Sequence, residues 1–221
     1  MAGVRSSVGV AGLSAALLVG LLVGCVAHAE DAEKRERQIG EAAADREEYV
    51  GQLVVFDAKQ ISLAKLALEH SQDPQVRQYA KKLLEDHQKH LKDLETWAQS
   101  KRVEVAAVDL STTNAQGTGG SGSAGVQKGY DERKVGVDKR LDKAIEDAKK
   151  DVGELQGKEG KDFDKAFLSR VVDDQKDGQE LVGDGLDTYR ADATFGLLLN
   201  HTNNLIDQNL ERGKQLEKVV D

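Results

Sequence analysis

The chain has 221 residues, with 31 Lys and Arg against 39 Asp and Glu, so its formal net charge is −8. This acidic balance argues against non-specific nucleic-acid binding, because a phosphate backbone is held by clustered Lys and Arg. Aromatic residues make up only 4% and there is a single proline, which disfavours a sandwich or barrel built from aromatic strands and frequent turns. The composition therefore predicts an all-α protein.

The N-terminal segment has the layout of an export signal. Residues 6–29 contain no Asp, Glu, Lys or Arg, a basic residue, Arg5, precedes them, and residues 13–23 consist largely of Leu, Val, Ala and Gly. A positive start followed by an apolar run is typical of a secretory signal peptide. The run is also long enough for a transmembrane helix, but the small residues near its end favour cleavage over retention.

The apolar run ends in Leu22-Val23-Gly24-Cys25, which resembles the lipobox of bacterial lipoprotein precursors. The resemblance implies that residues 1–24 are removed as a lipoprotein signal peptide and that Cys25 is lipidated. Val26 stands where an Asp would retain a Gram-negative lipoprotein in the inner membrane, so the resemblance implies an outer-membrane lipoprotein facing the periplasm. Ala27-His28-Ala29 offers a conventional signal-peptidase site, and cleavage there, after Ala29, would release a soluble periplasmic protein.

The rest of the chain divides into a charged segment and a helical body. Residues 30–48 are almost entirely charged residues and alanine, with Ile39 as their one large apolar residue. We therefore interpret residues 25–48 as a solvated tether that is helical in part. Apolar residues recur at three- and four-residue steps over residues 49–220, which predicts amphipathic helices. A Gly-, Ser- and Thr-rich stretch, residues 111–128, predicts a flexible linker between them.

The helical body is predicted to consist of two hairpins and one further helix. In the first hairpin Asp73 can cap a helix that starts at Pro74, where the missing N–H costs nothing. In the second hairpin Asp192 opens the last helix. The hairpins span residues 46–100 and 161–220, and the further helix lies at residues 135–155. Two hairpins bury their apolar faces best against each other, which predicts an antiparallel four-helix bundle.

Several short segments, in a fixed order, carry a resemblance to a known family: Leu63-Ala-Lys-Leu-Ala67, Asp73-Pro-Gln-Val76, Ala80-Lys-Lys-Leu-Leu-Glu-Asp-His87, Leu155-Gln-Gly157, Phe163-Asp-Lys-Ala-Phe167 and Val171-Val-Asp-Asp174. The chain resembles the bacterial predicted outer-membrane proteins of unknown function whose domain is a ferritin-like four-helix bundle. The resemblance covers about residues 50–215. It implies a ferritin-like bundle of two hairpins, with an extra helix after the linker.

The chain departs from this family where a metal site would be expected. The family commonly has Asp-His at two echoed positions, whereas this chain has Asp86-His87 at the first and Asp174-Gln175 at the second. Ser62 stands where a Glu is often found, and Asn209 stands in place of a His. A ferritin-like di-iron site also needs Glu-x-x-His pairs, and no His in this chain has a Glu three residues before it. The sequence therefore does not support a di-iron site.

His87 and His90 are the remaining candidates for metal binding, with Asp86 beside them. Two imidazoles three residues apart on a helix can chelate one divalent ion, although a third ligand is needed. The alternative is that His87 bonds across the bundle to Gln175 or Asn209 while His90 is solvated. We favour a buried polar layer that fixes the register of the helices. Its predicted further members are Asp57, Asp174, Gln175, Thr202 and Asn209.

Nothing in the sequence predicts catalysis: neither a nucleophile triad nor a phosphate-binding loop can be recognised, and we expect no enzyme activity and no cofactor. We expect an exported, lipid-anchored cell-envelope protein that acts as a structural or binding module and contacts the membrane through its anchor. The sequence names no protein partner. One alternative is a metal-binding ferritin-like protein that uses His87 and His90. Another is an interaction protein with an exposed apolar stripe on residues 135–155.

Overall fold

The computed structural model describes the backbone of residues 16–103, 108, 110 and 123–220, and within these ranges the side chains from residue 30 onward. The described residues form α-helices and no strand, so the prediction of an all-α fold is confirmed. The helices are α1 (Ala16–His70), α2 (Pro74–Lys101), α3 (Ala124–Gln156), α4 (Gly160–Thr188) and α5 (Ala193–Val220).

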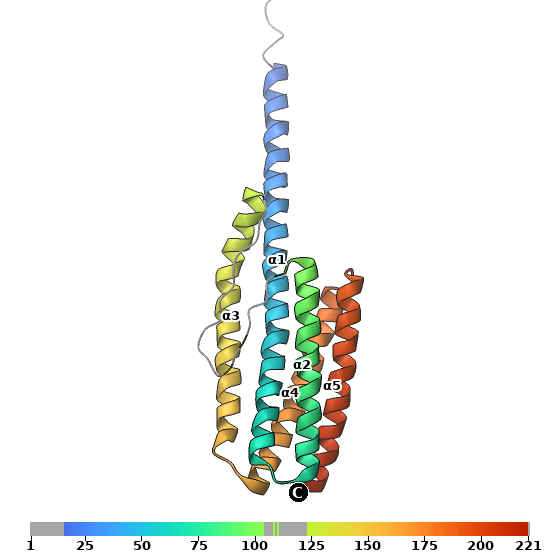
Figure 1. Cartoon of the computed structure of the whole chain (residues 1–221). Helices are drawn as coiled ribbons and strands as arrows, with labels where there is room; N and C mark the ends of the chain where they lie inside the picture. The colour runs from blue at the N-terminus through green and yellow to red at the C-terminus, as the bar shows by residue number, and fades with distance from the viewer. Residues whose placement is uncertain (1–15, 104–107, 109, 111–122, 221) are drawn as a thin grey trace, which may run out of the picture.

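Four of the helices, α1, α2, α4 and α5, lie side by side as a bundle (Figure 1). α1 contacts α2 and α4, and α5 contacts the same two helices, so the two hairpins pack against each other. α3 lies outside this bundle along α1 and carries the chain back to the end at which α4 begins. Two hairpins with one additional helix are the arrangement that the sequence predicts.

Acidic caps begin α2 and α5, as the sequence indicates for both. Asp73 Oδ1 accepts hydrogen bonds from the backbone N–H groups of Gln75 (2.7 Å) and Val76 (3.2 Å). Asp192 Oδ1 accepts from the backbone N–H of Phe195 (3.1 Å). Each cap satisfies N–H groups that have no partner within the first turn of a helix.

α1 differs from the predicted tether. Residues 25–48 belong to this one long helix, and Ala44 is buried against α3. Gly40 and Gly129 make the contact possible, because each lies against the backbone of the other helix, where a Cβ would not fit. Glycine and alanine do not form a stripe of large apolar residues along a helix. The hydrophobic pattern of the sequence therefore does not predict this helix contact.

The linker and the signal peptide fall largely outside the described residues. Of the predicted linker, residues 111–122 lie outside them, whereas residues 124–128 belong to α3, which therefore begins earlier than predicted. Of the predicted signal peptide, residues 1–15 lie outside the described residues, as do the side chains of Cys25 and Ala29.

The core consists of two apolar clusters, one toward each end of the bundle. One cluster contains Leu63, Leu83 and Phe167, and the other contains Leu53 and Leu199, all fully buried. On α1, α2 and α4, buried polar residues fall between the segments that supply the two clusters; on α5, Asn209 falls between them and Thr202 lies within the segment of one cluster. We call them the polar layer: Asp57, Gln60, His87, His90, Asp174, Gln175, Thr202 and Asn209.

Candidate functional site

The centre of the polar layer is the carboxylate of Asp57 on α1, which bonds two imidazoles of α2. Asp57 Oδ1 lies 2.7 Å from His87 Nδ1, and Asp57 Oδ2 lies 2.7 Å from His90 Nδ1. The side chains of all three residues are fully buried. The i, i+3 spacing of the two histidines lets both rings reach one carboxylate, because residues three apart share a helix face.

The far nitrogens of the two rings contact the second hairpin. His90 Nε2 lies 2.7 Å from the hydroxyl of Thr202, which donates to the carbonyl of Leu198 (2.9 Å). His87 Nε2 lies 3.3 Å from the amide nitrogen of Gln175. The two contacts join α2 to both helices of the second hairpin, since Thr202 lies on α5 and Gln175 on α4.

The carboxylate of Asp57 is enclosed by hydrogen-bond donors. Because the neighbouring histidines hold the pKa of Asp57 below its ordinary value, the carboxylate is ionised and each of its oxygens accepts from an imidazole Nδ1–H. A buried carboxylate requires such partners, because an unpaired charge in an apolar interior is strongly destabilising.

A chain of polar contacts continues from His87 to the surface. Gln175 Nε2 donates to Gln60 Oε1 (3.1 Å), and Gln60 Nε2 donates to Asp174 Oδ2 (2.9 Å). Lys59 Nζ lies 2.7 Å from Asp174 Oδ1 and 2.5 Å from a carboxylate oxygen of Asp151 on α3. The polar contacts thus reach from α5 through α2, α1 and α4 to α3.

The two buried carboxylates have opposite pKa shifts. Burial acts to raise the pKa of Asp57, but the charge of His90 and the hydrogen bonds from both histidines lower it below its ordinary value. Burial raises the pKa of Asp174, and Lys59 and Gln60 only partly oppose the rise. Asp57 is therefore held ionised, whereas Asp174 takes up a proton more readily than an exposed aspartate.

All five predicted members of the polar layer are buried, and polar contacts join four of them to the two histidines, whereas the side-chain nitrogen of Asn209 is buried with no hydrogen-bond partner among the described residues. His87 contacts Gln175, as expected, but the prediction of a solvated His90 is wrong, because His90 is buried against Asp57 and Thr202. Gln60 also belongs to the layer, although it is not among the predicted members. Its position, three residues after Asp57 and three before the apolar Leu63, would have indicated a place on the buried face.

The structure assigns the two imidazoles to a hydrogen-bond network. The third candidate, Asp86, pairs with Lys82 of its own helix and not with His87 or His90. Over the part of the chain that the structure describes, no group of three or more His, Cys, Asp or Glu side chains is arranged to hold a metal ion. Each ring nitrogen of His87 and His90 already has a hydrogen-bond partner.

Thr202, His90 and Asp57 also lie in the order of a nucleophile triad, with a hydroxyl, an imidazole and a carboxylate joined by two contacts of 2.7 Å. A nucleophile must meet its substrate, however, and all three side chains are sealed inside the bundle. Two surface pockets lie elsewhere. One follows α1 between Glu30 and Glu41, and the other is lined by α4 and α5 near Lys165 and Val220.

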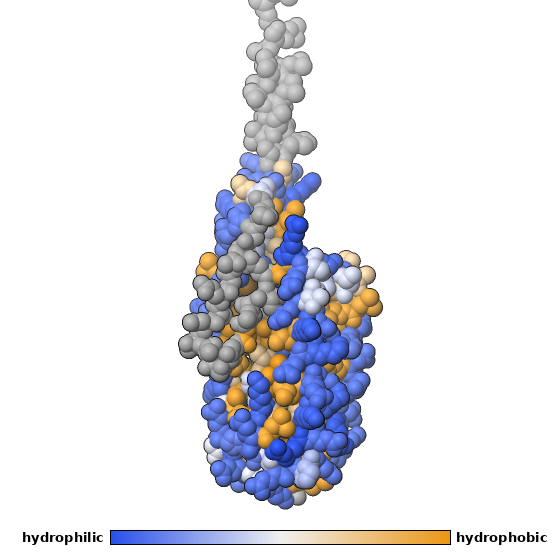
Figure 2. Space-filling view, viewed as in Figure 1, coloured by the Kyte–Doolittle hydropathy of each residue, from blue (hydrophilic) through white to orange (hydrophobic). Residues whose placement is uncertain are grey.

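The surface of the bundle is strongly charged. The face shown in Figure 2 is mostly hydrophilic, with apolar atoms in narrow bands. Of the predicted stripe on residues 135–155, Val137, Ala148, Val152 and Leu155 are buried, which disfavours the interpretation as an exposed interaction face. No described helix contains an apolar stretch that could cross a membrane.

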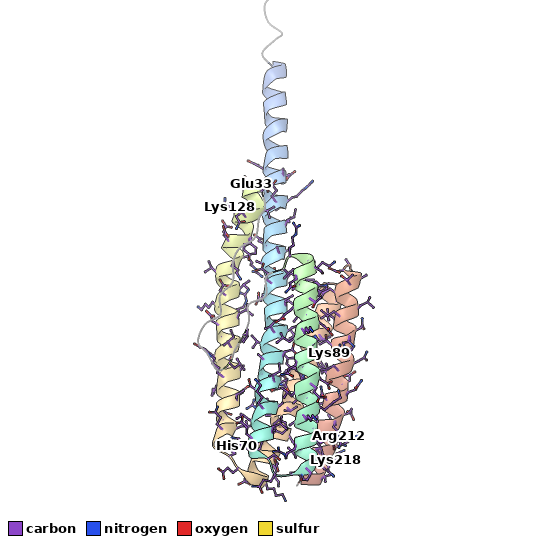
Figure 3. All side chains as sticks on the ribbon, in the orientation of Figure 1. Glu33, His70, Lys89, Lys128, Arg212 and Lys218 are labelled. Atoms are coloured by element: carbon purple, nitrogen blue, oxygen red, sulfur yellow. The ribbon has the colours of Figure 1, made fainter. Side chains whose placement is uncertain are left out.

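α3 is held to α1 by oppositely charged side chains beyond the end of the bundle. In Figure 3, Lys128 of α3 and Glu33 of α1 lie beside each other, with 3.8 Å between Nζ and a carboxylate oxygen. Further pairs continue toward the bundle: Arg37–Glu132, Arg133–Asp45, Lys134–Glu47 and Arg140–Glu48. The acidic residues come mostly from α1 and the basic ones mostly from α3.

The fold and the polar layer together define an all-helical bundle with a sealed, charged centre. The chain belongs to a family described as a domain of unknown function, DUF4142, whose model matches residues 31–216. The match includes the N-terminal part of α1 that contacts α3. No curated protein and no solved structure matches the chain.

Proposed function

We propose that this protein is an exported, lipid-anchored module of the cell envelope that acts as a structural or binding element and not as an enzyme. The main observation in favour of a non-catalytic role is the burial of the polar layer. The one described cluster of imidazoles and carboxylates lies inside the bundle with its nitrogen atoms bonded, so the surface must make the functional contacts.

Support for an anchored module comes from α1. This helix extends beyond the ends of α2 and α5 and so separates the bundle from the segment that contains Cys25 (Figure 1). Together with the lipobox-like Leu22-Val23-Gly24-Cys25, such an arrangement would hold the bundle at a distance from a membrane. The chain is acidic, so it would not be drawn to anionic lipid headgroups, and the acyl chains would supply the attachment.

The anchor is tested by expressing the full chain in a Gram-negative host with a labelled fatty acid. The wild type should take up the label and fractionate with the outer membrane, whereas Cys25→Ser should lose the label and enter the soluble periplasmic fraction. Val26→Asp is the matched control: it should keep the label and move to the inner membrane. An unlabelled wild-type chain whose intact mass corresponds to a start at Glu30 would contradict the proposal and favour cleavage after Ala29.

A metal-binding bundle that uses His87 and His90 is the second candidate. One observation favours it: the Nδ1 atoms of both rings converge on the carboxylate of Asp57. A metal would have to replace both Nδ1 protons. Metal analysis of the purified protein tests this candidate. Stoichiometric zinc, iron or manganese that is lost in both His87→Gln and His90→Gln would establish it in place of the purely structural role.

A further inference from the structure

The two halves of α3 are attached to the rest of the molecule in different ways. The C-terminal half supplies Val152 and Leu155 to one of the two apolar clusters of the bundle. The outer half, residues 124–140, contributes no described residue to either cluster, and its buried apolar side chains are Tyr130 and Val137. The outer half therefore depends on other contacts to stay in place.

The outer half is also a weak helix by itself. It contains three glycines, Gly125, Gly129 and Gly136, and glycine is the least favourable residue in a helix apart from proline. In the described structure, the side chain of Ser123 makes no hydrogen bond that would cap the first turn. Such a segment stays helical only while its contacts with α1 hold it, because most helix stability comes from tertiary packing.

Opposite charges supply much of this contact. Five ion pairs join the outer half to α1, and four of them place the basic side chain on α3: Lys128–Glu33, Arg133–Asp45, Lys134–Glu47, Arg140–Glu48 and, with the charges reversed, Glu132–Arg37. In four of the five, at least one side chain is more than a third exposed. Dissolved salt screens the attraction between exposed charges, so it weakens these pairs.

We propose that the outer half of α3 is a salt-responsive strap, which opens from α1 at raised ionic strength while the four-helix bundle stays folded. The strap lies along the part of α1 that extends beyond α2 and α5 (Figure 1). Opening exposes the face of α1 that contains Gly40 and Ala44, which the strap covers when it is closed. Between residues 33 and 48, α1 is then a single helix.

The opening is confined to the outer half because salt does not weaken the contacts of the other half. Val152 and Leu155 are held in the core by apolar burial, which added salt does not screen. The ion pair beside them is less exposed than those of the strap: Lys59 Nζ lies 2.5 Å from a carboxylate oxygen of Asp151, and the two side chains are 14% and 23% exposed. Partly buried pairs are screened much less than exposed ones.

Hydrogen–deuterium exchange of the purified full chain, measured by mass spectrometry at neutral pH, tests the strap. Raising NaCl from about 20 mM to about 500 mM should speed exchange over residues 124–140 about tenfold, because the Debye length falls from about 20 Å to about 4 Å. Exchange over α2, α4, α5 and residues 148–156 should change less than about twofold.

Three results would overturn the proposal. The first is exchange over residues 124–140 that does not respond to salt. The second is an equal acceleration of the bundle helices, which would mean that the whole protein unfolds. The third is a strap that is already unprotected at low salt, since it would then not be closed by its charges.

A charge reversal tests the ion pairs themselves. Arg140→Glu places a like charge beside Glu48, so exchange over the strap should be faster at low salt and depend less on salt than in the wild type. Adding Glu48→Arg should restore most of the protection. Lys143→Glu makes the same change in net charge, but the native lysine pairs with Asp147 of its own helix, so this control should follow the wild type. Equal effects of Arg140→Glu and Lys143→Glu would contradict the proposal. If Arg140→Glu does not fold, the salt titration of the wild type decides.

Discussion

At the scale of single residues, Asp57 is the member of the polar layer whose loss is expected to destabilise the bundle most. It accepts hydrogen bonds from both His87 and His90. Removing one partner of a buried hydrogen bond leaves the other unsatisfied, at a cost of about 1 to 3 kcal/mol and more for a charged group. The layer therefore tolerates loss of the outer residues better than loss of Asp57.

Asp57→Asn is expected to lower the free energy of unfolding by about 3 to 5 kcal/mol at neutral pH, because both imidazoles lose an ionised hydrogen-bond acceptor. The lowered pKa of Asp57 determines the pH dependence. Its stabilising contribution is fully present above the unfolded-state pKa, near 3.8, and is lost as the pH falls through the lower folded-state value. The difference between wild type and variant should therefore be constant from about pH 7 to 5 and shrink below about pH 4.

Urea unfolding followed by circular dichroism measures this difference. Asp187→Asn, on the exposed surface of α4, is the control and should change the midpoint little. If Asp57→Asn were as stable as the wild type at neutral pH, the carboxylate would not hold the two histidines together.

At the scale of the elements, the pairing of α1 with α3 differs from the packing of the four bundle helices. The bundle helices bury large side chains, whereas the outer part of the α1–α3 pair combines glycine contacts with surface ion pairs. Its apolar cluster is small and consists of Ala44, Tyr130, Val137 and the partly buried Leu141. Exposed ion pairs add little stability each, so close backbone contact has an important part in this pairing.

Two glycines of α3 allow a matched comparison. A methyl group at Gly129 would overlap the backbone carbonyl of Arg37, so Gly129→Ala should lower the free energy of unfolding by about 1 to 3 kcal/mol. A Cβ added at Gly153 would meet no atom within 4 Å outside its own stretch of helix backbone, so Gly153→Ala should instead raise the free energy of unfolding by about 0.8 to 1 kcal/mol through helix propensity. Hydrogen exchange should become faster over the start of α3 in Gly129→Ala alone. Equal effects of the two substitutions would contradict the close contact.

The Gly- and Ser-rich composition of residues 111–122 leads to a prediction for the connection between α2 and α3. Deleting Gly117–Gly120 should leave the helical circular dichroism unchanged and alter the free energy of unfolding by less than about 0.6 kcal/mol, since closure entropy depends weakly on loop length. The deletion stops short of Gly125, which lies against Glu36 of α1. A fall of many degrees in melting temperature would mean that the deleted segment is packed.

At the scale of the whole molecule, two apolar clusters enclose the polar layer from both ends. The buried aromatic side chains contribute to both clusters: Trp97 stacks on Phe195 in one, and Phe163 stacks on Phe167 in the other. A core of this extent needs no metal to fold, unlike a small zinc-dependent domain. The polar layer therefore selects one register of the helices, while the apolar clusters supply most of the stability.

We therefore expect that a chelator leaves the circular dichroism and the melting temperature of the purified protein unchanged. His87→Gln should lower the free energy of unfolding by no more than about 1 to 2 kcal/mol, because Asp57 keeps its bond to His90. Thermal melting with and without chelator, together with metal analysis, tests both statements. A chelator-induced fall in melting temperature that His87→Gln abolishes would contradict the structural role.

The amino-acid sequence by itself determined the helical class, the boundaries at Asp73 and Asp192, and most members of the polar layer. These features depend on local rules, namely helix capping and the 3.6-residue period that places polar residues on an otherwise apolar face. The tertiary structure decided that Asp57 bonds both histidines and that His90 is buried. It also decided that α1 and α3 meet through glycines. The height and rotation of one helix relative to another depend on the packing of every side chain between the two helices. The spacing of residues within a single helix does not determine them.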